Sequence, residues 1–185
     1  MLIKYTSEPT LSEVISVDDL KTFCRVSGST EDTLFDSLRA AAIEYVETAC
    51  NIRIGQVSAE GYLDKFEPAR FPVGPVVSIT SVQYLDQSNT LQTLATSKYY
   101  FEIDGNGGRI NFYNYPSLYS YALNRVKINF TVGHGVDDVP EAMVQAIRIL
   151  VASLYENRQA AVVGKTVSAV PYTVDSLLNK YRLLT

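Results

Sequence analysis

Residues 138–158 hold the sequence feature that most constrains the fold. Their apolar side chains recur at spacings of three and four residues, which places them along one face of a helix: Met143, Ala146, Ile147, Leu150, Val151, Leu154 and Tyr155. Val144 and Ile149 lie off that face, so we expect the helix to pack against neighbours on two sides. The pattern therefore predicts that residues 139–158 form the core helix of the protein.

The start of this helix carries a capping pattern. Asp138 can accept hydrogen bonds from the free N–H groups of the first turn, and Glu141 stands three residues later as its capping-box partner. Pro140 fits the first turn because no hydrogen bond is needed from its nitrogen there. These residues predict that the helix is capped at Asp138.

Two earlier helices are predicted by similar signals. Ser16 and Ser29 are each followed three residues later by an aspartate, which is a capping-box spacing. We expect helices over 16–27 and 31–50. Asn51 is expected to adopt the left-handed conformation that ends the second helix.

Both ends of the chain are predicted to lie outside this helical core. Residues 1–15 show no clear period and are expected to form an extended arm. Residues 159–170 are small and apolar and are expected to form a mobile loop or an arm. A last helix is predicted from Val174 to about Leu183, with Thr173 as its cap.

Between residues 52 and 133 the apolar period changes from helical to alternating, which is typical of strands. Five strands are predicted there, at 76–84, 90–94, 99–103, 109–113 and 125–132. The glycine-rich residues 104–108 are expected to connect the third and fourth as a hairpin turn.

The predicted fold class is therefore α+β. A helical bundle of three to four helices would carry a β-rich insertion, residues 52–133, between the second helix and the core helix. We expect one domain over 16–158, preceded by the N-terminal arm 1–15 and followed by the C-terminal arm and helix 159–185.

Composition limits the function. Hydrophobic residues make up 46% and charged residues 19%, and the formal charge is −4 with a pI near 5.0. An acidic chain is poorly suited to sequence-blind binding of nucleic acid, which depends on lysine and arginine displacing counterions. The absence of a signal-like or membrane-spanning segment predicts a soluble protein made in a cytoplasm. Cys24 and Cys50 are expected to be buried free thiols in a reducing compartment.

No catalytic, cofactor-binding or metal-binding residue is predicted. The single histidine, His134, lies between two glycines and has neither a nucleophile motif nor a second histidine near it, which favours a structural turn. Gly164-Lys165-Thr166 resembles the end of a phosphate-binding loop, but Gln159 stands where that motif needs glycine. The segment 104–107 lacks the acidic ligands of a calcium loop.

Four tyrosines form the one unusual aromatic cluster: Tyr113, Tyr115, Tyr119 and Tyr121. A stacking platform for nucleic acid would need interleaved lysine or arginine, whereas tyrosine is enriched in buried protein contacts. We therefore regard these four residues as candidates for a subunit interface.

The order of several short motifs supports a resemblance that covers most of the chain. These motifs lie at residues 17–21, 38–47, 50–52, 71–86, 128–135, 139–142, 154–158 and 174–178. Their succession resembles the head-tail connector (adaptor) proteins of long-tailed bacteriophages and gene transfer agents.

This resemblance implies a non-enzymatic protein that assembles as a ring, typically a dodecamer, on the portal at one capsid vertex. Such a ring extends the DNA channel and offers a docking surface to a stopper, tail-terminator or other tail protein. The protein would reside in the virion neck and be made in the host bacterial cytoplasm. DNA would pass through the lumen without sequence-specific binding, and no membrane would be involved.

The resemblance also implies that the C-terminal segment docks into the portal. The candidate anchors are Tyr172, Leu177, Leu178 and Tyr181. A ring needs head-to-tail surfaces that close by rotation, and the two-sided core helix, the tyrosine cluster and the apolar tail offer more apolar surface than one monomer needs.

Two other hypotheses remain open at this point. The tyrosine-rich loop fits a small carbohydrate- or peptide-binding β module on a helical scaffold. His134 fits, less well, a hydrolase.

Overall fold

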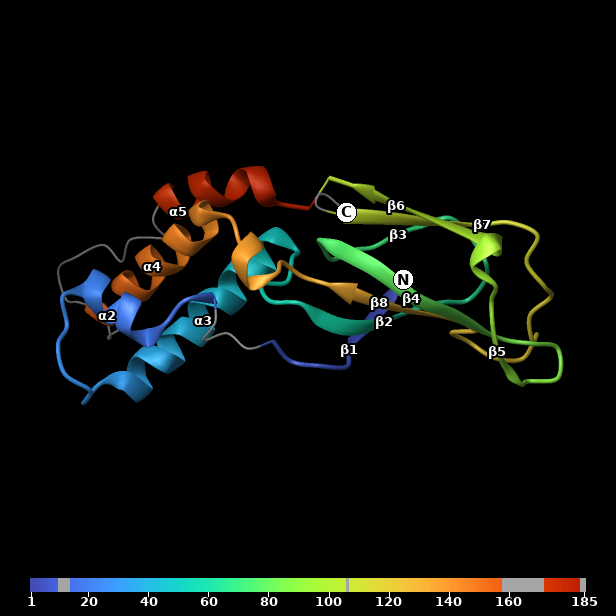
Figure 1. Ribbon diagram of the computed structural model, residues 1–185, viewed down its shortest axis with the longest axis horizontal. Coiled ribbons are helices and arrows are strands. Elements are labelled where there is room, and N and C mark those ends of the chain that lie inside the picture. Colours follow the sequence, from blue (N-terminus) through green and yellow to red (C-terminus); the bar gives the residue numbers. More distant parts are fainter. Residues whose placement is uncertain (10–13, 106, 158–171, 184–185) are drawn as a thin grey trace. The chain divides into compact units, whose positions relative to one another are not determined.

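The computed structural model describes residues 1–185 except 10–13, 106, 158–171 and 184–185 (Figure 1). The chain divides into two compact units. The helical unit comprises residues 10–50 and 135–182, and the β unit comprises residues 1–9, 51–134 and 183–185. The loop or arm predicted over 159–170 lies outside the described residues.

In the helical unit, the helices are α2 (Val17–Cys24), α3 (Asp32–Cys50), α4 (Glu141–Glu156) and α5 (Tyr172–Leu178). Helix α4 contacts each of the other three. Its buried side chains are Met143, Val144, Ala146, Ile147, Leu150 and Val151. The predicted role of this stretch as the core helix is confirmed, including the burial of Val144 on a second side.

The last turn of α4 departs from the predicted apolar face. Leu154 is 42% exposed, so its assignment to the core was wrong. Tyr155 packs against the ring of Phe35 at 4.9 Å between centroids, and its hydroxyl donates to Glu31 Oε2 at 2.7 Å. Tyr155 is the last residue of the apolar face of α4. Its ring and its hydroxyl connect α4 to the start of α3.

The capping predictions had mixed outcomes. Ser16 is the N-cap of α2: its Oγ accepts from the Asp19 N–H at 3.0 Å and donates to the Asp19 carboxylate at 2.7 Å. The cap at Asp138 was wrong, because the chain there forms a 3-10 turn (Val136–Asp138) and Pro140 takes the N-cap position. Glu141 accepts instead from Arg148 at 2.8 Å.

Helix ends also differ from the predicted ones at α2 and α5. Helix α2 ends at Cys24, because Arg25 adopts a left-handed conformation before Gly28 is reached. Helix α5 already includes Thr173, so Thr173 is not its cap, and a 3-10 turn (Asn179–Tyr181) follows it. The left-handed conformation predicted for Asn51 is confirmed, with φ of 54°.

In the β unit, the strands form two antiparallel sheets (Figure 1). The five-stranded sheet has the order β1-β2-β8-β4-β5, and the three-stranded sheet has the order β3-β7-β6. The strands are β1 (Leu2–Tyr5), β2 (Val57–Leu63), β3 (Ala69–Arg70), β4 (Val76–Leu85), β5 (Leu91–Thr93), β6 (Tyr99–Asp104), β7 (Gly107–Phe112) and β8 (Val126–Val132). The α+β class is confirmed.

The number of strands was underestimated. All five predicted strands are present, but β2 and β3 were missed, and the predicted N-terminal arm contains β1, which pairs with β2. Strand β2 contains Ala59 and Gly61, which have low strand propensity. Strand β3 is two residues long and lies between Pro68 and Pro72. Two residues are too few to show an alternating apolar pattern.

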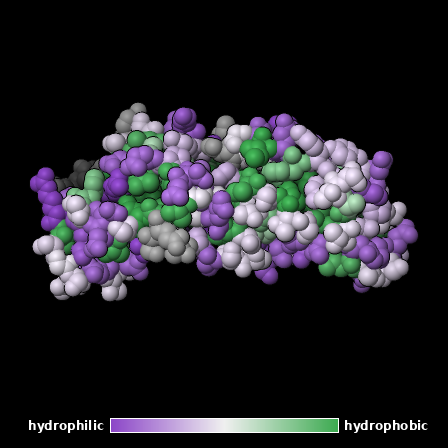
Figure 2. Space-filling view, in the orientation of Figure 1, coloured by the Kyte–Doolittle hydropathy of each residue, from purple (hydrophilic) through white to green (hydrophobic). Residues whose placement is uncertain are grey.

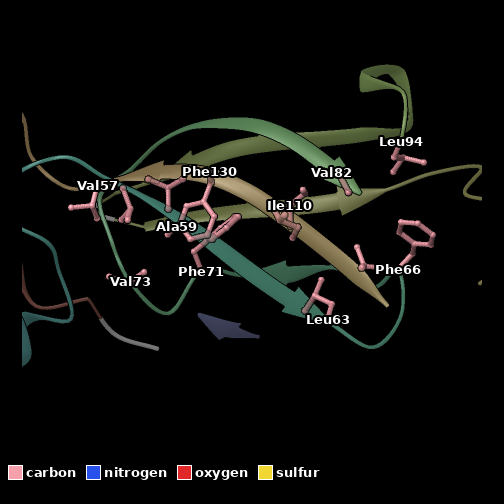
Figure 3. Close-up of a cluster of buried hydrophobic side chains, with 14 residues drawn as sticks. Val57, Ala59, Leu63, Phe66, Phe71, Val73, Val82, Leu94, Ile110 and Phe130 are labelled. Carbon is pink, nitrogen blue, oxygen red and sulfur yellow. The ribbon is translucent and has the colours of Figure 1, made fainter. Parts of the chain in front are cut away.

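Side chains from both sheets form the core of the β unit (Figure 3). Strand β8 buries every second residue, from Val126 to Val132, as expected for a central strand with one face on the core. The rings of Phe71 and Phe130 lie 4.7 Å apart and join the segment after β3 to β8. The two sheets are therefore held together by interdigitated apolar side chains.

Two chain segments approach unusually closely near Gly133. His134 N–H donates to the Arg53 carbonyl at 3.0 Å, and Gly133 N–H donates to the Pro75 carbonyl at 2.9 Å. Gly133 has φ of +117°, and a Cβ placed there would lie 2.2 Å from the Gly55 carbonyl oxygen. Only glycine fits at this position.

We predict that Gly133→Ala destabilises the protein by more than about 2 kcal/mol, because the added methyl meets backbone in a conformation that L-residues avoid. The matched control is Gly28→Ala. Gly28 also has positive φ, +85°, but nothing lies within 4 Å of its Cβ position, so we expect a cost of about 1 kcal/mol. Urea unfolding of both variants measures the difference, and equal costs would contradict the clash.

Candidate assembly surfaces

The segment 113–125, which contains the tyrosine cluster, is fixed to the end of β4 by hydrogen bonds. Tyr119 N–H donates to the Leu85 carbonyl at 3.1 Å, and Leu85 N–H donates to the Arg125 carbonyl at 2.9 Å. The Arg125 guanidinium donates to the Tyr119 carbonyl at 3.0 Å. We call residues 113–125 the tyrosine segment. Although it is irregular, its backbone is held in place, so its side chains are presented in defined positions.

The four tyrosines lie in different environments. Tyr115 stacks on Phe66 with 4.9 Å between ring centroids, which ties it to the core of the β unit. Tyr119 is half-buried and meets the edge of Tyr121 at 5.8 Å. Tyr113 is exposed, and Tyr121 is 89% exposed. The structure therefore brings the four onto one segment but leaves Tyr121 as its most accessible ring.

The structure adds two leucines to this surface that sequence reasoning missed. Leu123, also in the tyrosine segment, is 79% exposed. Leu91 on β5 is exposed and pairs with Leu85, the residue that holds the segment. An apolar residue in a polar turn, as in Ala122-Leu123-Asn124, was the signal available for Leu123. Hydrophobic side chains interspersed with hydrophilic ones also reach the visible surface (Figure 2).

Helix α5 places the C-terminal candidates differently. Leu178 is fully buried with Val174 in the helical unit, and the Cys50 thiol lies 3.9 Å from the Leu178 carbonyl. Leu177 and Tyr181 are half-buried and so reach the surface, with Lys180 Nζ 5.9 Å from the Tyr181 ring centroid. Tyr172 is the first residue of α5, and its side chain lies outside what the structure describes.

Charged side chains of the β unit are engaged in structural ion pairs. The carboxylate of Asp104 accepts from Arg109 at 2.7 Å and also from Arg70. The hydrogen bond from Arg109, and then the charge of Arg70, hold the pKa of Asp104 below its usual range. The pKa of Glu60 is likewise lowered by a hydrogen bond from Tyr62 and by Lys127. These carboxylates have the partners of a structural network, not of a catalytic acid.

The other residues weighed for chemistry are His134 and the two cysteines. His134 is held by its backbone beside Arg53 and forms a parallel bridge with Ile54. Both cysteines are free, and burial raises the pKa of each thiol, which disfavours the reactive thiolate. Cys50 is buried as predicted, but Cys24 is partly exposed.

Within the described part of the chain, no group of three or more histidine, cysteine, aspartate or glutamate side chains is placed to hold a metal ion. Within the same residues, no helix combines the length and the apolar character that crossing a bilayer requires.

We predict that truncating Tyr115 and truncating Tyr121 change the stability of the subunit by different amounts. Tyr115→Ala should destabilise the monomer by about 1 kcal/mol or more, because it loses the stacked ring of Phe66. Tyr121→Ala should change stability by less than about 0.5 kcal/mol, because its ring is almost fully exposed. Thermal unfolding of the two variants tests this, and similar losses would contradict the assigned environments.

A second pair tests helix α5. Leu178→Ala should cost about 2–5 kcal/mol through lost core packing, whereas its neighbour Leu177→Ala should cost about 1 kcal/mol or less. Urea unfolding measures both. An equal effect would mean that α5 is not packed through Leu178.

In the solved structures, a chain in the neck of an empty GTA particle, computed with C6 symmetry, superposes with a TM-score of 0.81 and 21% identity, covering 100% of this chain and 97% of that one. A chain in the virion of a native gene transfer agent (GTA) particle gives 0.79 and 21%, with the same coverage. The neck of a native GTA particle computed with C12 symmetry gives 0.77 and 20%, again over 100% and 97%.

At this level of identity the three structures establish a shared fold over 100% of this chain and 97% of each of the others. No curated protein matches the sequence. The family model described as "HCP: Head completion protein" matches residues 13–184, which includes the helices of the helical unit and most of the β unit. The chain therefore belongs to the head completion protein family.

Proposed function

We propose that this protein is a structural head-tail connector (adaptor) of a tailed phage or a related particle. It forms a ring beneath the portal, extends the DNA channel and offers a docking surface to the next neck or tail protein. One observation carries the proposal: both units together match a chain from a GTA neck over 100% of this sequence, within a family of head completion proteins.

The ring is supported by the symmetry of those particles. The two neck structures were computed with C6 and C12 symmetry, and both contain a chain of this fold. A rotational ring needs one surface on each subunit that meets a different surface on its neighbour. We infer a dodecamer from the higher of these symmetries.

The division of the chain supports distinct roles for its parts. The β strands 57–132 lie in sequence between α3 and α4, as an insertion into a helical bundle over 16–158 would. The C-terminal part, 159–185, would dock into the portal. Leu177 and Tyr181 are the accessible anchors on α5, and Tyr172 is a third candidate. Leu178 could contribute only if α5 leaves its own core, because Leu178 is fully buried.

The tyrosine segment suits a contact between subunits. Tyr121 and Leu123 expose apolar surface on a segment whose backbone is fixed by Leu85 and Arg125, so little order has to be gained on binding. Tyr113, Tyr115 and Tyr119 would line the same contact.

An acidic protein suits a conduit for DNA. With a formal charge of −4, the subunit gives a ring of net negative charge, which repels the phosphate backbone and disfavours adhesion to the wall. We propose that DNA passes without sequence-specific contacts and that the protein contributes to virion assembly and genome ejection without catalysis. It would reside in the virion neck after synthesis in the bacterial cytoplasm.

Light scattering tests the proposal directly. We expect either a closed ring of the 20.5 kDa protein alone, or a monomer that joins its own portal in a stoichiometric ring. A monomer that never binds this portal would contradict the proposal and would favour the alternative, a ligand- or peptide-binding β module on a helical scaffold.

We predict that the double variant Tyr121→Asp with Leu123→Asp abolishes the ring while the subunit still folds, because two charges replace exposed apolar contacts. Ser120→Asp, at the exposed position directly before Tyr121 in the same segment, controls for added charge and should assemble normally. Normal assembly of the double variant would remove the tyrosine segment from the interface.

A further inference from the structure

The edge strands of the two sheets differ in length and in charge. An edge strand leaves N–H and C=O groups without a strand partner on its outer side, and monomers protect such edges by shortness, lysine or proline. The edges are β1 and β5 in the five-stranded sheet, and β3 and β6 in the three-stranded sheet. Strand β6 is the longest of these at six residues, and it contains neither lysine nor proline. It is the least protected edge among the described strands.

The hydrogen bonds of β7 fix which groups of β6 face outward. Tyr113 N–H donates to the Lys98 carbonyl, so Tyr113 faces the β6 side. Because directions alternate along a strand, the β7 residues Gly107, Arg109 and Asn111 also face β6. Their register partners on β6 are Asp104, Glu102 and Tyr100. The N–H and C=O groups of the alternate residues, Tyr99, Phe101 and Ile103, therefore point away from the sheet.

The opposite edge of the same sheet is blocked. Phe71 N–H donates to the Gly108 carbonyl, so Phe71 faces β7 and by alternation Arg70 faces outward from β3. Pro68 and Pro72 lie two residues to either side of Arg70, where the same alternation would point their nitrogens outward. Proline has no N–H to offer there. One edge of this sheet can accept a strand and the other cannot.

Strand β1 also directs backbone groups outward. Thr6 N–H donates to the Ser58 carbonyl at 2.9 Å, so Thr6 faces β2. By alternation Leu2 and Lys4 face β2 as well, and the N–H and C=O groups of Ile3 point away from the sheet. None of the described strands pairs with the outer side of β1 or of β6.

The charges of β1 and β6 are complementary. Strand β6 carries Glu102 and Asp104, whereas β1 carries Lys4. Both Lys4 and Glu102 are exposed. Strand β5, the other edge of the five-stranded sheet, has the sequence Leu-Gln-Thr and carries no charge. Charge therefore favours β1 over β5 as a partner for β6.

The neighbours of these two charges within their own sheets are engaged with other groups. Glu102 stands in register with Arg109, whose guanidinium donates to Asp104 at 2.7 Å. Lys4 stands in register with Glu60, which forms an ion pair with Lys127 at 3.2 Å. Glu102 and Lys4 can therefore each gain a partner of opposite charge from outside.

We propose that the outer edge of β1 pairs in the antiparallel direction with the outer edge of β6 of a second copy, so that Lys4 lies opposite Glu102. This inference rests on the proposed ring. Outward groups must meet outward groups, so Ile3 lies opposite Phe101 or Ile103. Ile103 is the choice that places Lys4 opposite an acidic residue, and it also places Tyr5 opposite Phe101.

Apolar exposure at both edges supports the same contact. Leu2 on β1 is 62% exposed and Ile103 on β6 is 59% exposed. In Figure 1, β6 runs along the upper border of the β unit, whereas β1 lies at its lower side. Each subunit would offer β1 to one neighbour and β6 to the other, which is the head-to-tail arrangement that a closed ring requires.

Disulfide cross-linking between copies tests the inference. In a Cys24→Ser background, Lys4→Cys protein is mixed with Glu102→Cys protein that carries a tag, and rings are assembled with the portal and oxidised. We expect a disulfide-linked dimer of one tagged and one untagged chain, because the proposed pairing brings their Cα atoms to about 4.5 Å. Gln92→Cys, exposed on β5, replaces Glu102→Cys as the matched control and should yield none.

A charge reversal gives an independent readout. Lys4→Glu or Glu102→Lys alone places like charges opposite each other, so we expect each to assemble at least about fivefold more weakly than the wild type. The double variant restores opposite charges between copies and should recover most of that loss. Circular dichroism checks that all three subunits are folded.

Four results would overturn the inference. These are cross-links that form equally with Gln92→Cys, dimers of Glu102→Cys protein alone, which would mean that β6 pairs with itself, a Glu102→Cys cross-link only to the portal, and no recovery in the double charge variant. In each case a wild-type ring would leave the proposed connector function standing. A wild-type chain that forms no ring, alone or with its portal, would instead remove both.

Discussion

The close approach of Gly133 to Gly55 is the constraint on which the two units depend. The chain leaves the helical unit after Cys50 and returns to it at Gly135. A bridge from Ile54 to His134 holds the departing and returning segments together, and a bridge from Ile52 to Gly74 ties the departing segment to the residues before β4. Helices α3 and α4 are far apart in sequence, and their packing requires the intervening β strands to begin and end at one place. The missing side chain of Gly133 allows this.

Much of the helical unit could be predicted because its signals are local. The apolar period of α4 and the capping box at Ser16 each depend on residues within one or two turns. The cap predicted at Asp138 was wrong because a different local structure formed there. A 3-10 turn competed for the same backbone, and a short aspartate suits that turn as well as a helix start.

The β unit was harder to predict because its strands are stabilised by partners distant in sequence. Strand β2 tolerates Gly61 and Ala59 since β1 and β8 flank it on both sides. Strand β3 is defined only by its pairing with β7. The position of a strand at an edge, which distinguishes β6 from β8, follows from topology and has no signature in composition.

Candidate surface residues could be predicted as a group but not individually. Sequence identified the tyrosine cluster, yet only the packing of Phe66 separates Tyr115 from Tyr121. Likewise, the period of α5 does not say which of two adjacent leucines is buried. Leu178 is the buried one, and α5 packs against α4 and α3, which are contacts between elements that the period of one helix does not reveal.

The two prolines that flank β3 limit what this sheet can build. A sheet with both edges open can extend copy after copy into an endless ribbon, as amyloid does. With Pro68 and Pro72 on one side, copies of the three-stranded sheet cannot stack edge to edge without limit. Edge-to-edge pairing between copies of this sheet is therefore restricted to the β6 edge.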